Sequence, residues 1–206
     1  KEWYHAKSML QENKILDFPN LPYYLENRGN DVEDAVRLVQ SEAILRYLGN
    51  KYNLMGKQNI PPAKEHVVDM LLEEARDLDS TLIGLSYEQG AEAVATWLRS
   101  DEDLHNKLKV WREYIVERTE GPFVLGGTQL TVVDLKLYTF LYKFQHAQAT
   151  LMVGSIPEAD VPCLPFWVPA YLEKVQTATP ELQAYLQSPD VMDNPMNNPH
   201  ARFDTF

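Results

Sequence analysis

From residue 66 onward, apolar residues recur at the 3.6-residue spacing of amphipathic helices. The pattern predicts one long helix with an acidic opposite face, followed by helices over about 94–115 and 131–144 and no strand. The first of these helices has its apolar stripe at Val68, Leu71, Leu72, Ala75, Leu78, Leu82 and Leu85, and its acidic face at Glu65, Asp69, Glu73 and Glu74.

Polar residues mark where several of these helices start. Ser100 is expected to cap a helix that carries the apolar run after it. Thr131 is followed by Asp134 three residues on, which is an Asp variant of the capping box. Two shorter helices are expected to start near Pro165 and Pro180.

The first part of the chain has a different pattern. Residues 1–14 are polar and compatible with a helix, whereas 21–25 and 35–39 have the apolar composition of short strands, separated by an acidic loop that contains glycine. The gap between them suits a loose β-hairpin. A helix over 42–50 follows, with Ser41 well placed as its N-cap.

These patterns predict a fold of the α/β plus all-α class in two domains. We expect a partial α/β domain over 1–52, a linker over 53–62, an all-helical domain over 63–188 and an extended tail over 189–206. The linker contains Gly56 and the Pro61-Pro62 pair, which disfavour regular structure.

Composition and charge exclude several function classes. The formal net charge of −11 argues against nucleic acid as a partner, because phosphate neutralisation requires clusters of Lys and Arg. No apolar stretch approaches the roughly 18 residues of a membrane span. The five histidines show no metal-ligand spacing, so we expect no metal site. The single cysteine, Cys163, excludes an intrachain disulfide and is compatible with a reducing compartment.

Gln40 and Ser41 stand where the second strand gives way to a helix, and two explanations are open. Capping of the helix by Ser41 is the simpler one. A helix N-terminus also carries free N–H donors and partial positive charge, so it can bind a carboxylate. The Gln40 amide can both donate and accept, and with Ser41 it could hold the amino and carboxyl groups of an amino acid.

Three blocks of sequence resemble one enzyme family. "DFPNLPYYL", "QSEAILRYLGNKYNLMG" and "LTVVDL" are similar, in that order, to segments of mu-class glutathione S-transferases. The resemblance covers the chain from Trp3 to about Leu186. It implies a thioredoxin-like N-terminal domain, partial here, followed by the helical C-terminal domain of the family.

The resemblance also assigns roles in glutathione binding. It implies that Gln40 and Ser41 hold the γ-glutamyl end and that Pro22, which follows a cis peptide bond in the family, lies beside them. Trp3 and Lys7 match residues that hold the glycine carboxylate. The remaining assignments are Asn20 and Leu21, which pair with the cysteinyl part, and Asp77, which reaches glutathione in the neighbouring subunit.

Further matches concern the second substrate and the assembly. Tyr87 matches a tyrosine of the electrophile site, Phe18 an aromatic "lock" inserted into the partner subunit, and Arg46 an arginine at the two-fold axis. From the residues alone, Phe18 would be interpreted as core, Asp77 as one more charge on an acidic face, and Trp3 with Lys7 as surface packing.

Other features depart from the family. Additional residues lie between Lys7 and Phe18 and between the two strands, and Glu42 follows the Gln-Ser pair where a carboxylate should dock. The family's first strand, first helix and second strand have no counterpart here. That segment carries the catalytic Tyr, so no catalytic residue is assigned in this sequence, and we expect one upstream of Lys1.

The resemblance implies a transferase that conjugates glutathione, as co-substrate and without a cofactor, to a hydrophobic electrophile. It implies a homodimer located in the cytoplasm, although an organelle is not excluded. The alternative is a non-catalytic module of the same fold, acting as a scaffold or a subunit of a larger complex.

Overall fold

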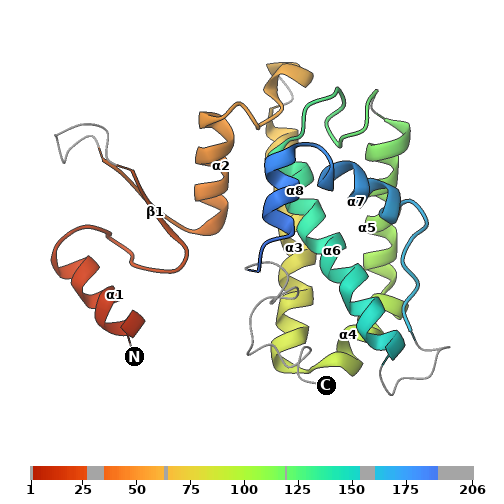
Figure 1. Ribbon diagram of the computed structural model, residues 1–206, viewed down its shortest axis with the longest axis horizontal. Coiled ribbons are helices and arrows are strands. Elements are labelled where there is room, and N and C mark those ends of the chain that lie inside the picture. Colours follow the sequence, from red (N-terminus) through yellow and green to blue (C-terminus); the bar gives the residue numbers. More distant parts are fainter. Residues whose placement is uncertain (1, 27–34, 63–64, 119, 154–160, 190–206) are drawn as a thin grey trace. The chain divides into compact units, whose positions relative to one another are not determined.

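The computed structural model describes residues 2–26, 35–62, 65–118, 120–153 and 161–189. The chain divides into two compact units, Lys1–Met55 and Gly56–Phe206, each described by itself below. The described residues are mostly helical with one small two-stranded sheet (Figure 1), which agrees with the expected fold class. The expected loop between the strands and most of the expected tail lie outside the described residues.

The smaller unit contains α1 (Glu2–Glu12), β1 (Tyr23–Glu26), β2 (Val36–Val39) and α2 (Ser41–Lys51). The two strands form the expected antiparallel pair, with Tyr23 opposite Val39 and Glu26 opposite Val36. β1 begins two residues later than the sequence indicated. Pro22 has no N–H to donate, so regular pairing starts only after it.

The Glu26 side chain links the hairpin to α2 through hydrogen bonds. Its Oε2 accepts hydrogen bonds from Lys51 Nζ at 2.7 Å, Tyr24 Oη at 2.8 Å and Tyr47 Oη at 2.9 Å. These donors, Lys51 first, lower the pKa of Glu26 from 4.5 to about 2. The carboxylate in turn raises the pKa of Lys51 and of Tyr24. The ionised Glu26 carboxylate therefore joins β1 to α2.

The larger unit is a bundle around α6 (Val132–Val153), which contacts α3, α4 and α7 (Figure 1). The other elements of this unit are the short η2 (Lys57–Asn59), α3 (His66–Glu88), α4 (Ala91–Ser100), α5 (Glu102–Arg112), the π-helical turn η4 (Glu113–Glu117), α7 (Val168–Gln176) and α8 (Pro180–Leu186).

The core of this unit follows the predicted helical stripe. Every predicted position of α3 up to Leu82 is buried, and Leu85, near the helix end, is half-buried. The largest fully buried side chains come from five helices: Leu72, Leu82, Leu98, Leu104, Leu137, Phe140, Leu141, Phe144, Tyr171 and Leu172. The apolar face of α3 therefore packs as its periodicity predicted.

The expected capping box at the start of α6 is confirmed. Asp134 Oδ2 accepts from Thr131 N at 2.9 Å and from Thr131 Oγ1 at 2.6 Å. Its Oδ1 accepts from Val124 N at 2.8 Å and from Tyr171 Oη at 2.9 Å. Burial raises the pKa of Asp134, while these hydrogen bonds act to lower it. One fully buried carboxylate thus joins the helix start, the preceding loop and α7.

Two predicted helix starts need correction. Ser100 is the last residue of α4, and Asp101 caps α5 instead, accepting from Leu104 N at 2.7 Å. Asp101 also closes α4, because its N–H donates to Trp97 O at 3.1 Å; one residue serves both ends, so no separate Ser cap is needed. The helix expected near Pro165 begins at Val168.

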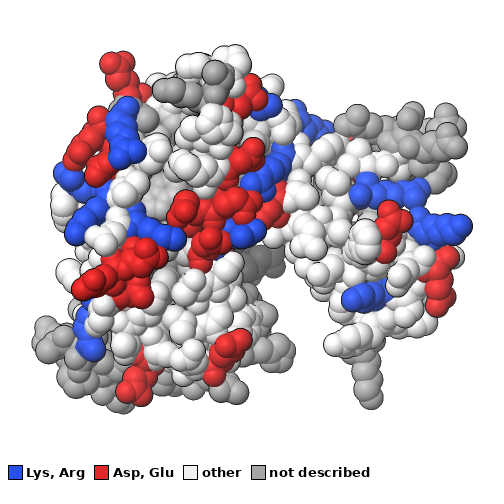
Figure 2. Space-filling model, turned by 180° about the vertical axis from the view of Figure 1, so that it is seen from behind, with Lys and Arg blue, Asp and Glu red and all other residues white. Residues whose placement is uncertain are grey.

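Acidic and basic side chains are interleaved on one face of the larger unit (Figure 2). On α3, Glu73 pairs with Arg76 at 2.6 Å. Lys107 of α5 lies 3.1 Å from Glu74 and 3.7 Å from Asp103. Part of the acidic face predicted for α3 is therefore neutralised locally.

Candidate functional site

One end of the β-hairpin gathers several predicted site residues. Since Tyr23 pairs with Val39, the residues just outside that pair, Pro22 and Gln40, lie at the same end of the antiparallel ladder. The Leu21–Pro22 peptide bond is cis, as the resemblance implied. α2 starts directly after Gln40, so the helix N-terminus opens at this end of the sheet.

Gln40 has an unusual backbone conformation. Its φ is 73° and its ψ is 115°, in the positive-φ half of the map that residues other than glycine rarely occupy. Gln40 O accepts the first helical hydrogen bond, from Ile44 N at 3.0 Å. Such backbone outliers are concentrated at binding and catalytic sites. This conformation turns the chain from β2 into α2 and leaves the Gln40 side chain exposed.

The prediction that Ser41 is the N-cap is wrong. Gln40 occupies the cap position, and Ser41 is the first residue of the helix. The chain turns at Gln40, one residue earlier than expected, so the boundary shifts with it. The Gln40 side chain makes no capping hydrogen bond, and both side chains are exposed.

α1 contacts the same end of the hairpin through aromatic rings. Trp3 stacks on Tyr23 with centroids 6.3 Å apart and ring planes 14° from parallel. Lys7 lies one turn further along α1 and is exposed. Trp3, Tyr23 and the Pro22–Gln40 end therefore form one connected region.

The segment before β1 is exposed as well. Asn20 Oδ1 accepts from Leu21 N at 3.0 Å, and Asn20, Leu21 and Pro22 are all exposed. Leu21 has 58% of its surface accessible. The segment is therefore accessible to solvent, with the Leu21 N–H bonded to the Asn20 side chain.

Asp77 and Tyr87 both lie on α3, in the larger unit. Asp77 is exposed and accepts from Arg76 Nη2 at 3.1 Å. Tyr87 is half-buried near the C-terminal end of the helix.

Phe18 is 78% exposed, so its interpretation as a core residue is wrong. Arg46 lies on α2, where its Nη1 donates to Glu42 O at 3.4 Å.

The larger unit has a groove of about 360 Å³ between α3 and α5. The groove is lined by Met70, Leu71, Glu74, Asn106, Lys107, Val110, Trp111, Tyr114 and Arg118.

Comparison with known proteins supplies independent evidence, although no family model matches the chain. The chain is 27% identical over 203 residues to a class-mu 26 kDa glutathione S-transferase isozyme of Fasciola hepatica, covering 98% of this chain and 78% of that protein. It is 37% identical over 133 residues to a glutathione S-transferase of Tyrophagus putrescentiae, covering 64% and 53%. It is 32% identical over 140 residues to glutathione S-transferase Mu 5 of Homo sapiens, covering 68% and 55%.

The chain is a homologue of the mu-class glutathione S-transferases. The alignments with the last two relatives span little more than half of each relative's length. Activity, substrates and partners are therefore taken up below as proposals.

In this mu-class homologue, sequence reasoning missed Tyr23 and the Glu26 cluster. Tyr23 directly follows Pro22 and lies within the predicted strand, but nothing in the local sequence predicts that its ring stacks on Trp3. Tyr47 and Lys51 lie 21 and 25 residues from Glu26 and meet it only through packing.

Over the described ranges, no group of three or more His, Cys, Asp or Glu is placed to hold a metal ion. None of the helices in that part of the chain is long and apolar enough to cross a membrane.

Proposed function

We propose that the protein is a glutathione S-transferase that conjugates the thiolate of glutathione to hydrophobic electrophiles. The observation that carries the proposal is the Gln40–Ser41 junction. Two exposed polar side chains stand at a helix N-terminus, and the backbone of the first, Gln40, is held at positive φ. The homology to mu-class glutathione S-transferases supports glutathione as the ligand of this arrangement.

In the proposed complex, the α-carboxylate of the γ-glutamyl group docks at the start of α2. It accepts from the Ser41 hydroxyl and from N–H groups of the first helical turn, where the helix dipole favours negative charge. The Gln40 amide binds the same amino-acid head group. Glutathione then runs along the exposed backbone of Asn20 and Leu21.

At its other end, the glycine carboxylate is bound by α1. Lys7 supplies a positive charge, and Trp3 supplies an indole N–H donor held in place by its stack on Tyr23. Asp77 of a second copy meets the glutamyl amino group, and Tyr87 faces the electrophile.

The chemistry requires the thiolate of glutathione. An unassisted thiol with a pKa of about 8.5 is only a few per cent ionised at neutral pH. A hydrogen-bond donor to the sulfur is therefore needed, and we assign that role to no residue of this sequence. The residues named above bind and orient the co-substrate.

We also propose that the protein forms a homodimer, with Phe18 of one copy in the α3–α5 groove of the other. An aromatic ring that is 78% exposed favours burial in an apolar site. In the groove, Met70 and Val110 are 48% and 44% exposed, and Trp111 and Tyr114 supply aromatic walls. Such a contact is repeated twice in a two-fold dimer.

Calorimetric titration with glutathione tests the binding site. Gln40→Ala is expected to weaken binding by about 1–3 kcal/mol, the usual cost of removing a hydrogen-bond partner to a charged group. Gln11→Ala is the matched control, because it makes the same change on an exposed position of α1. Equal affinity of the two variants and the wild type would refute the site.

An assay of the protein with glutathione and a generic aromatic electrophile tests catalysis. Turnover that is lost in Gln40→Ala supports the transferase. Glutathione binding without turnover in the whole protein supports the non-catalytic alternative.

A further inference from the structure

The chain leaves the α-helical path directly after α5. Glu113–Glu117 forms the π-helical turn η4, and Arg118 N donates to Glu113 O at 2.8 Å, five residues back. Such turns are rare and are found frequently at functional sites. This short stretch must therefore contain interactions that favour i,i+5 closure over the i,i+4 closure of an α-helix.

Two ion pairs span the turn at the same spacing of five residues. Arg112 Nη1 pairs with Glu117 Oε1 at 2.6 Å, and Arg118 Nη2 pairs with Glu113 Oε2. In an α-helix, positions five apart point about 140° away from each other, because each residue turns the chain by about 100°. Both pairs therefore favour the π conformation over the α conformation.

The α-helical alternative would also bring like charges together. It would place Glu113 one turn from Glu117, and like charges at i,i+4 destabilise a helix. Residues 112–118 read Arg-Glu-Tyr-Ile-Val-Glu-Arg, so four charges attract in pairs in the π form, whereas the two glutamates repel in the α form. The charge pattern of this stretch therefore selects the π turn.

The π turn shapes one wall of the groove between α3 and α5. Tyr114 and Arg118 both line that groove. The Arg118 guanidinium lies over the Tyr114 ring at 4.7 Å, and this ring lies 6.3 Å from that of Trp111, which is also in the wall. Trp111 is buried and fixes the helix before the turn. A change to α-helical closure would move Arg118 around the axis by one residue position, about 100°.

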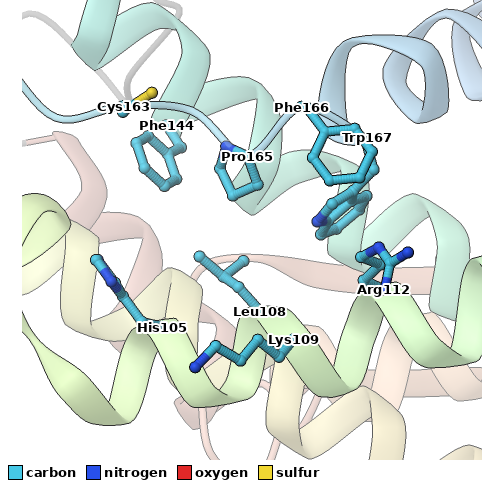
Figure 3. A pocket seen from close by; sticks show the side chains of 9 residues that line it. All are labelled: His105, Leu108, Lys109, Arg112, Phe144, Cys163, Pro165, Phe166 and Trp167. Carbon is cyan, nitrogen blue, oxygen red and sulfur yellow. The ribbon is translucent and has the colours of Figure 1, made fainter.

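Arg112 is held at the start of the turn by another segment. Its guanidinium lies over the Phe166 ring at 5.6 Å. Figure 3 shows Arg112 on α5, beside Phe166 and Trp167 of the segment that precedes α7. This contact restricts the Arg112 side chain, so its pairing with Glu117 costs less side-chain entropy.

We propose that η4 is a charge-controlled conformational device that shapes the α3–α5 groove. The two ion pairs hold the turn in the π form, in which Tyr114 and Arg118 line the groove. Loss of one charge lets the turn relax to an α-helix, and docking in the groove weakens because its wall rearranges. This last step rests on the proposed dimer, in which Phe18 of a second copy occupies the groove, whereas the conformation of the turn does not.

Glu117→Lys tests the device with a single substitution. It replaces the pair with Arg112 by a like-charge contact, and it gives Glu113 an attractive i,i+4 partner that favours the α form. Crystal structures of the wild type and the variant, grown at low ionic strength, measure the effect. We expect Arg118 N to donate to Glu113 O in the wild type and to Tyr114 O in the variant.

Two further variants are controls. Glu173→Lys makes the same change on an exposed position of α7 and should keep the π turn. The fourfold inversion restores both pairs and the like-charge contact, so it should also keep the turn; it is Arg112→Glu/Glu113→Arg/Glu117→Arg/Arg118→Glu. The four side chains of the pairs are between 38% and 50% exposed, so these changes are not expected to unfold the protein.

Sedimentation equilibrium measures the consequence for the groove. Glu117→Lys should raise the dissociation constant of the dimer about tenfold or more, because aromatic and Arg side chains dominate docking energies, and Glu173→Lys should leave it unchanged. The difference from wild type should shrink in about 0.5 M salt, which screens exposed ion pairs.

A π turn retained in Glu117→Lys or lost in the fourfold inversion would overturn the proposal. So would an α-helical turn in Glu117→Lys with unchanged dimer affinity. A monomeric wild type would refute the dimer alone, because the crystal structures still decide whether charge selects the turn.

Discussion

Lys143 Nζ lies 2.7 Å from Asp79 Oδ1, and both residues are buried where α6 packs on α3. Lys136 Nζ lies 3.8 Å from the other carboxylate oxygen of Asp79. The pair joins positions 64 residues apart in the sequence, inside the packed interface of two long helices. Removing one partner would leave an uncompensated charge in that interface.

We therefore predict that Asp79→Ala lowers the free energy of unfolding by about 3–5 kcal/mol. The double variant Asp79→Leu/Lys143→Met should cost much less, because no buried charge remains unpaired. Urea unfolding measures both, with Asp103→Ala at an exposed position as control. A double variant as unstable as Asp79→Ala would contradict this account.

A second prediction concerns Asp134. Asp134→Ala removes one acceptor from four buried donors, so it should cost about 3 kcal/mol or more in unfolding free energy. Thr179→Ala is a useful comparison. Thr179 caps α8 through one hydrogen bond, in which its Oγ1 accepts from Leu182 N at 3.1 Å. Losing this cap should lower the free energy of unfolding by about 1 kcal/mol. Equal costs by thermal or urea unfolding would show that Asp134 acts only as a cap.

The third prediction is a pH dependence. Because the folded-state pKa of Glu26 is lowered from 4.5 to about 2, its contribution to stability is present above about pH 4.5 and lost as the pH falls toward 2. Glu26→Gln should therefore be less stable than wild type at pH 6, and the difference should shrink by pH 2.5. Urea midpoints at the two pH values measure it. A difference in stability between wild type and Glu26→Gln that grows at pH 2.5 would contradict a lowered pKa for Glu26.

Glu42 gives the fourth prediction, which rests on the proposed glutathione site. It lies in the first turn of α2, where the γ-glutamyl carboxylate is proposed to dock. Glu42→Gln removes a like charge and should tighten glutathione binding by a few tenths to about 1 kcal/mol, more at low salt. Calorimetry at two ionic strengths measures it, and weaker binding of Glu42→Gln would place the carboxylate elsewhere.

The fifth prediction concerns the proposed dimer. Phe18→Ser should dissociate it or weaken it strongly, since the ring would no longer fill the groove. Val110→Asp should have the same effect from the opposite side of the contact. Sedimentation velocity at micromolar concentration measures both, with Tyr185→Ser, also an exposed aromatic residue, as control. A monomeric wild type would exclude the proposed homodimer.

Local sequence alone predicted much of the structure of this protein. The spacing of Val68, Leu71, Leu72 and Ala75 predicted the buried face of α3, because a helix repeats every 3.6 residues whatever surrounds it. The Thr131–Asp134 box was likewise predictable, since its hydrogen bonds join residues three apart. The resemblance to mu-class enzymes rested on short blocks of the same local kind.

The tertiary structure decided what depends on distant contacts or on backbone conformation. Gln40, held at positive φ, takes the N-cap position that was predicted for Ser41, and the exposure of Phe18 reversed its interpretation as core. The ion pair of Asp79 with Lys143 and the stack of Trp3 on Tyr23 were not predictable, because neither pair lies within one helix turn or one strand. Composition sets which side chains are present, but only packing determines which of them meet.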